Sequence, residues 1–218
     1  MDTKKSKKEI AEILETLEEM YPDAECELNY QNPFQLLIAT ILSAQTTDKK
    51  VNQVTKGLFE KYKTSKDFLQ LEQIELEKII KEIGLYRSKA KNILNTCRML
   101  VELYDSKVPD RKEELMKLSG VGRKTANVVV SNAFSVPAIA VDTHVFRVAN
   151  RIGLAHSDHV VGTEEQLMEN IKKEKWSKAH HLLIFHGRRT CKARKPACEK
   201  CPLTGECCYY QNIVGKLR

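Results

Sequence analysis

Four cysteines stand close together near the C-terminal end of the chain, where their thiolates could share one metal centre. Cys191, Cys198, Cys201 and Cys207 follow the spacing C-x6-C-x2-C-x5-C. A thiolate near other thiolates must lose its proton and its hydration, and a metal ion or an iron–sulfur cluster compensates that cost. Cys208 adjoins Cys207 and leaves the identity of the fourth ligand open.

Three kinds of site could use these cysteines. Disulfides need an oxidising compartment, but the chain opens with MDTKKSKKEIAEIL, which has no apolar segment or cleavage site of the secretory kind. Zinc sites usually present two short cysteine pairs, and only Cys198 and Cys201 form such a pair. A cubane cluster is bulkier and can take four thiolates from one winding segment, so we favour [4Fe–4S] and keep zinc as the alternative.

A second candidate site is the glycine turn inside LMKLSGVGRKTANVVV, residues 115–130. The pattern predicts two helices joined at Gly120-Val121-Gly122, a helix-hairpin-helix. Glycines there let the backbone turn tightly and bring amides close to a phosphate, while the second helix presents its positive N-terminal end. The same turn could join helices in a protein that binds no DNA, so alone it is a weak signal.

The charge of the chain favours a polyanionic partner. Thirty-six Lys and Arg against 29 Asp and Glu give a net charge of +7 and a pI near 9.0. Basic residues crowd the cysteine loop, and its inner stretch carries Lys192, Arg194 and Lys195. We expect this loop to contact phosphates, the alternative being a soluble protein with a basic surface. No apolar run reaches the roughly 18 residues that a membrane span needs, so no membrane partner is expected.

The elements that position these residues are predicted from helical periodicity and from capping residues. The first half predicts an amphipathic helix ending before Pro22, a buried helix after Asn32-Pro33, a helix from Asp48 and a capping box at Thr64 and Asp67. The second half predicts helices that begin at Ser88, at a capping box of Asp110 and Glu113, and near Asp142, Thr163 and Ser177. Strand signals are nearly absent, so the expected fold is all-α.

Five motifs together resemble the endonuclease III family. They are SAQTTD at 43–48, GLYRSKAKNI at 84–93, GVGRKTANVV at 120–129, VDTHVFRV at 141–148 and the cysteine loop. The resemblance implies a monomeric base-excision-repair DNA glycosylase with AP lyase activity on oxidised pyrimidines in duplex DNA. It implies a six-helix domain over 22–135, with its hairpin at about 111–134, and a [4Fe–4S] domain formed by 1–21 and 136–218. Without a targeting extension, we expect the bacterial cytoplasm, on nucleoid DNA.

The resemblance also implies the reacting groups. Lys124 falls at the family's nucleophile position and would form a Schiff base with C1′ of the sugar, which acidifies the 2′ proton for elimination. An ordinary lysine amine is almost wholly protonated at neutral pH, so we expect the helix N-terminus, burial and a nearby carboxylate to help remove the proton. Asp142 matches the family's carboxylate, which would stabilise positive charge at C1′, and it also suits a helix N-cap.

Other residues match family positions that contact DNA. Chemistry on a stacked base requires flipping it out of the duplex, and Gln45 and Leu85 match the residues that fill the vacated space. The hairpin Gly120, Val121, Gly122 and Arg123 is expected at a phosphate. His144 could contact another phosphate, although a packed or capping histidine is equally compatible with its position. The glutamine and leucine also have ordinary readings, at a helix end and in a helix cap.

Several positions depart from the family pattern. Ser119 replaces a common proline, Thr46 stands where many members carry cysteine, Arg189 stands where tyrosine is frequent, and Met116 leaves no carboxylate below the hairpin. Two rival functions remain: a mismatch adenine glycosylase, whose family lacks the nucleophilic lysine and carries an extra C-terminal domain, and a non-enzymatic metal-containing DNA-binding regulator.

Overall fold

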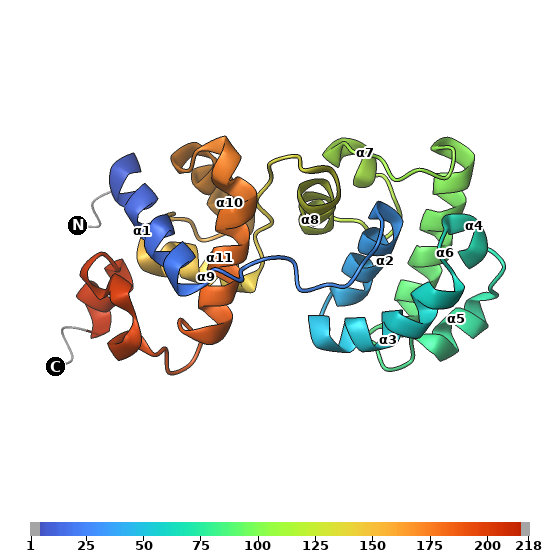
Figure 1. The fold of residues 1–218 in the computed structure, drawn as a ribbon, viewed down its shortest axis with the longest axis horizontal. Helices are drawn as coiled ribbons and strands as arrows, with labels where there is room; N and C mark the ends of the chain where they lie inside the picture. The colour runs from blue at the N-terminus through green and yellow to red at the C-terminus, as the bar shows by residue number, and fades with distance from the viewer. Residues whose placement is uncertain (1–4, 215–218) are drawn as a thin grey trace. The chain divides into compact units, whose positions relative to one another are not determined.

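The chain is all-helical, as the sequence predicts. The computed structural model describes residues 5–214 and contains no strand among them, so the first four and last four residues of the expected cluster domain lie outside the described part. The chain divides into two compact units, one of residues 27–136 and one formed by residues up to 26 together with those from 137 (Figure 1). The divisions follow Cys26 and Val136, whereas the sequence places them after Tyr21 and Ser135.

The unit of residues 27–136 holds seven helical segments, where six are expected, and two of the seven are single turns. They are α2 (Pro33–Ser43), α3 (Asp48–Lys61), α4 (Ser65–Phe68), α5 (Gln73–Ile79), α6 (Tyr86–Leu103), α7 (Lys112–Leu115) and α8 (Arg123–Phe134). Helix α2 is the centre of this unit: every side chain from Phe34 to Leu42 is buried, and the helix packs against α3, α6 and α8. The apolar run of the sequence predicts this burial.

Local capping explains most of the helix starts in this unit. Asn32 caps α2 with Pro33 at its first position, and Thr64 forms the predicted capping box with Asp67. Two predictions are wrong. The expected start at Ser88 gives way to Tyr86, because Leu85 turns the chain into α6 in a left-handed conformation without a side-chain cap. The capping box expected at Asp110 does not form either, since Arg111 occupies the N-cap position of α7.

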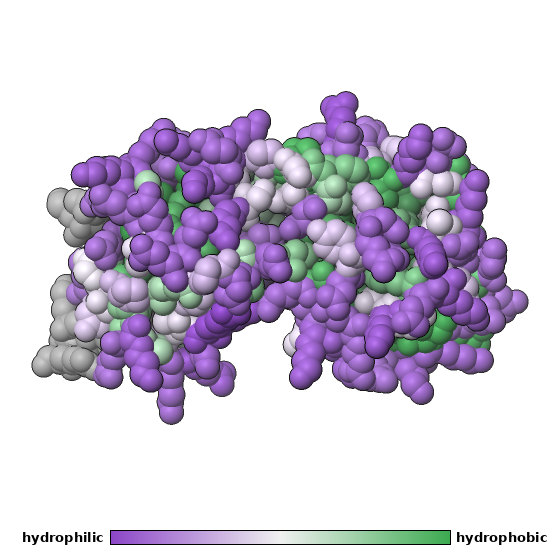
Figure 2. Space-filling view, in the orientation of Figure 1, coloured by the Kyte–Doolittle hydropathy of each residue, from purple (hydrophilic) through white to green (hydrophobic). Residues whose placement is uncertain are grey.

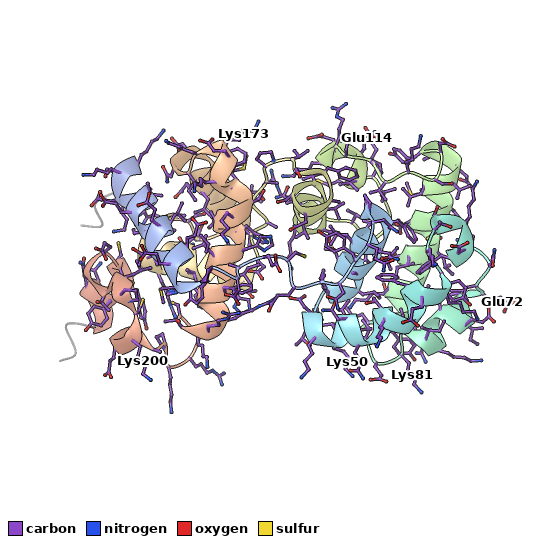
Figure 3. All side chains as sticks on the ribbon, in the orientation of Figure 1. Lys50, Glu72, Lys81, Glu114, Lys173 and Lys200 are labelled. Atoms are coloured by element: carbon purple, nitrogen blue, oxygen red, sulfur yellow. The ribbon has the colours of Figure 1, made fainter. Side chains whose placement is uncertain are left out.

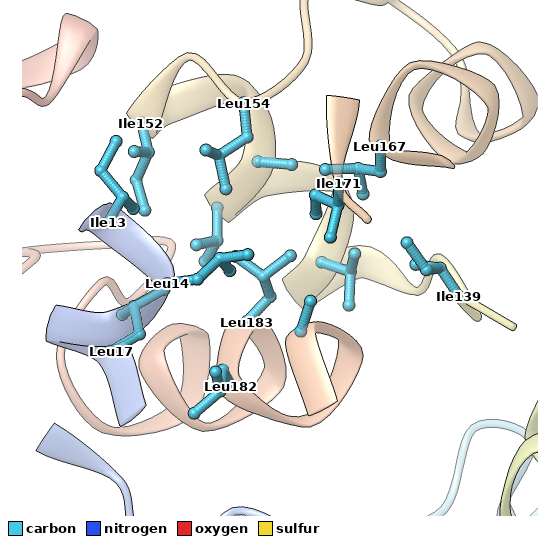
Figure 4. Close-up of a cluster of buried hydrophobic side chains, with 14 of the residues drawn as sticks. Ile13, Leu14, Leu17, Ile139, Ile152, Leu154, Leu167, Ile171, Leu182 and Leu183 are labelled. Atoms are coloured by element: carbon cyan, nitrogen blue, oxygen red, sulfur yellow. The ribbon is translucent and has the colours of Figure 1, made fainter. Parts of the chain in front are cut away.

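The second unit contains α1 (Lys7–Met20), α9 (Thr143–Ile152), α10 (Val160–Asn170) and α11 (Trp176–Arg189), with short helical turns at Lys173–Lys175, Cys198–Lys200, Pro202–Gly205 and Tyr210–Val214. Helix α11 packs against α1 and α9, and α10 packs against α9. Figure 4 shows the shared core, in which Ile13, Leu17, Ile152 and Leu183 meet. This core brings the first helix of the chain onto the same apolar cluster as the helices beyond residue 137.

Two helix starts in this unit differ from the sequence-based expectation. His159, and not a residue near Thr163, caps α10, because its Nδ1 accepts a hydrogen bond from the Gly162 amide at 3.0 Å. Helix α11 starts at Trp176 without a side-chain cap, because the turn Lys173–Lys175 leads directly into it. The segment 136–141, which joins the two units, has no regular structure.

The face of the molecule that Figure 2 shows is predominantly hydrophilic. Exposed lysines stand on both units, and Figure 3 shows Lys81, Lys173 and Lys200 directed away from the ribbon. Within residues 5–214, no helix combines the length and the apolar character needed to cross a membrane.

Candidate active site and cysteine loop

The two glycines of the hairpin have different structural roles. Gly120 has φ +76°, and a Cβ there would come within 2.9 Å of Asn92, so the turn requires glycine at this position. Gly122 is the N-cap of α8 with φ −93°, which any residue can adopt, and a Cβ there would meet nothing within 4 Å. The expectation that both glycines permit the turn is therefore wrong for Gly122, whose bare backbone instead leaves open space above the start of the helix.

Alanine substitutions should separate these roles. Gly120→Ala should lower the free energy of unfolding by at least about 1–2 kcal/mol, the cost of a left-handed conformation for a residue with a Cβ. Gly122→Ala should leave stability unchanged within about 0.5 kcal/mol but weaken binding to duplex DNA, since a methyl group would hold a phosphate away from the amides. Chemical denaturation and DNA titration of both variants measure the two effects. A stable Gly122→Ala variant with wild-type affinity would remove this amide from the DNA interface.

Serine at position 119 does not leave the hairpin unsupported. The Thr96 hydroxyl donates to the carbonyl oxygen of Ser119 at 2.8 Å, and the Ser119 hydroxyl lies 3.1 Å from Oδ1 of Asn92. Both partners lie on α6. The hairpin is thus held by hydrogen bonds from a neighbouring helix where a proline would stiffen it directly.

Lys124 occupies the second position of α8, immediately after the hairpin. Its side chain is exposed, so the burial expected to assist loss of its proton does not occur in this structure. The start of a helix is nevertheless a suitable place for a nucleophile that must approach a phosphodiester backbone, because the first amides of the helix attract phosphate.

Asp142 is the N-cap of α9, as the sequence predicts. One carboxylate oxygen, Oδ1, accepts hydrogen bonds from the amides of His144 and Val145, each at 2.8 Å. The side chain is half-buried, and the second oxygen, Oδ2, takes part in neither bond. The cap fixes the rotamer of the carboxylate while one oxygen stays outside the capping interaction, so capping and electrostatic catalysis are compatible here.

His144 lies in a defined hydrogen-bonding position on α9. Its Nδ1 is 3.2 Å from Nη2 of Arg147, and Nη2 also donates to the carbonyl oxygen of Gly187. Nε of Arg147 donates to the carbonyl oxygen of Cys191. A guanidinium only donates, so Nδ1 must accept and the ring proton is placed on Nε2. His144 can therefore offer an N–H group to a phosphate oxygen through Nε2.

Gln45 and Leu85 share an unusual backbone conformation. Both have positive φ, 55° and 58° respectively, and both side chains are exposed, Leu85 by 60%. Their loops are neighbours, because a Cβ on Gly84 would lie 3.6 Å from the carbonyl oxygen of Gln45. The structure thus brings these two predicted residues close to each other near the start of α6, and each is held in a conformation that residues with a Cβ normally avoid.

One face of α6 carries supporting residues that sequence reasoning missed. Leu85, Lys89, Asn92 and Thr96 follow a spacing of four, three and four residues, which places them along one side of the helix. Lys89 bonds the segment around Gln45, while Asn92 and Thr96 bond the hairpin. The helical spacing was the available signal, but the partners are distant in sequence.

The four predicted cysteines lie in one loop that follows α11, and the side chain of each is half-buried. None of the four forms a disulfide. Burial raises the pKa of Cys201, and the nearby Cys191 and Cys198 raise it further. Burial raises the pKa of Cys207 to about 11, with smaller contributions from Cys191 and Cys201. Thiols in such an environment do not readily lose their protons. A positively charged centre would stabilise the four thiolates, so the cysteines suit a metal centre.

Cys207 lies near Cys191 and Cys201, whereas the sulfur of the neighbouring Cys208 lies close to Gly153. A Cβ on Gly153 would come within 2.5 Å of the Cys208 sulfur, so this thiol is packed against the end of α9. Among the described residues, no three His, Cys, Asp or Glu side chains are gathered tightly enough to hold a single metal ion. A cubane cluster is larger than one ion and holds its thiolates further apart than a single zinc ion does.

The basic stretch of the loop has exposed side chains, and Arg151 bonds its backbone. Arg151 donates to the carbonyl oxygens of Lys192 and Ala193 at 2.8 and 3.1 Å, and one of its nitrogens lies 3.5 Å from the Cys191 sulfur. The side chains of Lys192, Arg194 and Lys195 remain in solvent. The loop therefore presents three cations from a fixed backbone, as a phosphate-contacting surface would.

Comparison with known proteins places this geometry in one family. Residues 38–173 match the HhH-GPD superfamily of base excision DNA repair proteins, and residues 191–207 match the iron–sulfur binding domain of endonuclease III. Endonuclease III of Bacillus subtilis is 54% identical over 92% of both chains, and that of Rickettsia felis is 51% identical over 95% of this chain and 98% of its own. A solved structure described as a trapped endonuclease III–DNA covalent intermediate matches with a TM-score of 0.92 and 52% identity, covering 98% of this chain and all of the other.

Proposed function

The chain belongs to the endonuclease III family of base-excision-repair DNA glycosylases with AP lyase activity, and we propose that its substrates are oxidised pyrimidines in duplex DNA. One observation carries the proposal: the exposed Lys124 at the start of α8 directly follows the open backbone of the hairpin at Gly122. DNA binding follows from the family; the damaged or abasic nucleotide as the specific target is the proposed step.

We propose that Lys124 attacks C1′ of the damaged nucleotide. Its amine forms a bond to C1′ as the glycosidic bond breaks and the base leaves, and rearrangement with opening of the sugar gives a Schiff base. The iminium withdraws electrons from C2′, so a 2′ proton is lost and the C3′–O bond breaks, which cuts the strand on the 3′ side. The carboxylate of Asp142 stabilises the positive charge that develops at C1′ and assists the proton transfers.

The cofactor of the chain is a [4Fe–4S] cluster, and we propose Cys191, Cys198, Cys201 and Cys207 as its ligands. These four side chains would hold the cluster, which would supply a structural constraint on the loop. The chain's own contribution is the bracing of that loop by Arg151, whose bonds to the loop backbone keep the basic side chains on the surface.

Serine substitutions at the adjacent cysteines test the ligand assignment. Cys207→Ser should lose most of the bound iron and sulfide and the visible absorbance, because a hydroxyl is a poor ligand for iron beside three thiolates. Cys208→Ser should retain about four iron atoms per chain. Iron and sulfide analysis of the two purified proteins gives the answer, and iron retained by Cys207→Ser but lost by Cys208→Ser would reverse the assignment.

We propose that Gln45 and Leu85 enter the duplex when the damaged nucleotide is flipped out. The exposed amide of Gln45 can hydrogen-bond the unpaired opposite base, and the exposed side chain of Leu85 can act as an apolar wedge. Their fixed backbone conformations support the proposal, because a side chain that must displace a base is most effective when little freedom is lost on binding.

Alanine substitutions at these positions should slow flipping selectively. Gln45→Ala and Leu85→Ala should each reduce excision from fully paired duplex by about tenfold or more, since flipping a stacked base costs a few kcal/mol. Cleavage at a preformed abasic site should fall much less, because an abasic sugar forfeits little stacking. Single-turnover rates on the two substrates provide the ratio. Equal losses on both substrates would mean a folding defect or a general binding role.

The remaining DNA contacts are proposed from exposure and charge. Gly120, Val121, Gly122 and Arg123 would hold one phosphate, while His144 and the basic stretch Lys192, Arg194 and Lys195 would hold others. We propose that the unit of residues 27–136 is the hairpin domain, that the other unit is the cluster domain, and that the chain acts as a monomer. Chromosomal DNA as the substrate would place it in the bacterial cytoplasm, on the nucleoid.

A panel of duplexes tests the substrate proposal. We expect release of thymine glycol and other oxidised pyrimidines, little release of 8-oxoguanine and no release of adenine opposite guanine or 8-oxoguanine. Adenine release without strand cleavage would instead support a mismatch adenine glycosylase. Binding of all the duplexes without any base release or cleavage of an abasic site would support a non-enzymatic regulator.

A further inference from the structure

Lys89 is a buried lysine whose amine faces only uncharged oxygens. The residue is 5% exposed, and its Nζ donates to the carbonyl oxygens of Leu42 and Ala44 at 2.9 and 2.5 Å and to the Thr46 hydroxyl at 3.3 Å. Burial lowers the pKa of Lys89, because no carboxylate among its partners repays the lost hydration. An apolar side chain at position 89 would avoid this cost. The buried amine is therefore explained by the three oxygens that it bonds.

The three acceptors lie in the last turn of α2 and in the short segment after it, on both sides of Gln45. The last carbonyls of a helix have no partner within the helix, and a cation there is favourable, yet α2 has no basic residue in its own last turn. Ala44 and Thr46 are the two neighbours of Gln45, and Lys89 bonds both of them. The left-handed conformation of Gln45 costs about 1–2 kcal/mol, so it needs support from its surroundings.

We propose that Lys89 is a positioning residue that holds Gln45 in the conformation presented to the DNA. The inference rests on the proposed role of Gln45 in filling the space left by the flipped nucleotide. Lys89 itself is buried and contacts no DNA; it acts through the loop it bonds. Leu85 stands four residues earlier on the same helix, and its carbonyl oxygen accepts the Lys89 amide at 3.0 Å. The start of α6 thus sets the positions of Gln45 and Leu85 together.

Lys89→Met tests the inference, with Lys91→Met as the matched control. Methionine keeps the length of the buried side chain and removes all three hydrogen bonds, while Lys91 lies exposed on the same helix. In the cluster-loaded protein, Lys89→Met should reduce excision of thymine glycol from paired duplex by roughly tenfold, the effect of losing charge-assisted hydrogen bonds. Cleavage at a preformed abasic site should change by less than about twofold, and Lys91→Met should match wild type on both substrates.

Combination with Gln45→Ala separates positioning from a general structural role. If Lys89 acts through Gln45, adding Lys89→Met to Gln45→Ala should cause little further loss, because the side chain that it positions is already absent. Additive losses in this double-mutant cycle would overturn the inference. Should Lys89→Met fail to fold, Thr46→Val removes one acceptor and keeps the amine. A selective loss on paired duplex by Thr46→Val would support positioning, and a wild-type ratio of the two rates would contradict it.

The single variants also distinguish this inference from the proposal beneath it. A Gln45→Ala variant that excises from paired duplex at the wild-type rate would remove Gln45 from the flipping step, whatever Lys89 does. A slow Gln45→Ala variant combined with a wild-type Lys89→Met variant would leave the role of Gln45 intact and overturn only the positioning by Lys89.

Discussion

Lys124→Gln should abolish base release and strand cleavage, by more than about a thousandfold, while leaving affinity for damaged duplex close to wild type. Glutamine has nearly the same length but no nucleophilic amine, so neither the bond to C1′ nor the Schiff base can form. The hairpin backbone, the basic loop, Gln45 and Leu85 are untouched, so the substrate should still bind. Single-turnover assays on thymine glycol duplex, with DNA titration of the same preparation, measure both properties.

Lys117→Gln is the control for loss of a lysine charge near the hairpin. Lys117 is exposed in the same segment, and its amine lies 2.8 Å from the carboxylate of Glu114. A surface ion pair of this kind contributes little to stability. We expect wild-type rates from this variant. Loss of activity in both variants would indicate a charge effect on DNA binding, and full activity in Lys124→Gln would place the nucleophile elsewhere.

Asp142→Asn should slow base excision by about a hundredfold to a thousandfold, the scale for loss of one interaction with transition-state charge. Asparagine is as good an N-cap as aspartate, so the bonds to the amides of His144 and Val145 can persist and α9 should keep its start. The variant therefore removes the negative charge with little change in fold. Stability and DNA affinity should remain near wild type, which stability and binding measurements would verify.

An excision rate within about threefold of wild type would limit Asp142 to capping. A large loss of thermal stability in Asp142→Asn would mean that the carboxylate charge supports α9, and the activity loss could then not be assigned to catalysis. Asp142→Ala completes the set, because it removes the cap and the charge together and should destabilise α9 by about 1 kcal/mol more than the asparagine variant.

Much of the fold could be predicted because its signals are local. Asn32-Pro33, the box at Thr64 and Asp67, and the cap at Asp142 each act within one helical turn, and each appears in the structure as expected. The start of α6 lacks such a signal. Leu85 leads into α6 through a left-handed backbone without a capping side chain, and no pattern of residue types marks leucine for that conformation.

The candidate site shows the same division between local and distant information. The family motifs point to Lys124, Asp142 and the cysteines by position, but they do not show that Lys124 is exposed or that Gly122 lacks any steric need for glycine. Lys89 looks like an ordinary solvated lysine in the sequence, because its partners at Leu42 and Ala44 lie more than 40 positions away. Only the packing of α6 on the end of α2 makes it a buried donor.

Mass spectrometry of the borohydride-trapped complex tests the central assignment most directly. Protein incubated with thymine glycol duplex and borohydride should become covalently attached to the DNA, because hydride reduces the Schiff base to a stable amine. Digestion of the complex should then yield one DNA-modified peptide, with the modification on Lys124. Attachment through another lysine, or base release without any covalent complex, would contradict the account; in the second case water would be the nucleophile and Asp142 the principal catalytic group.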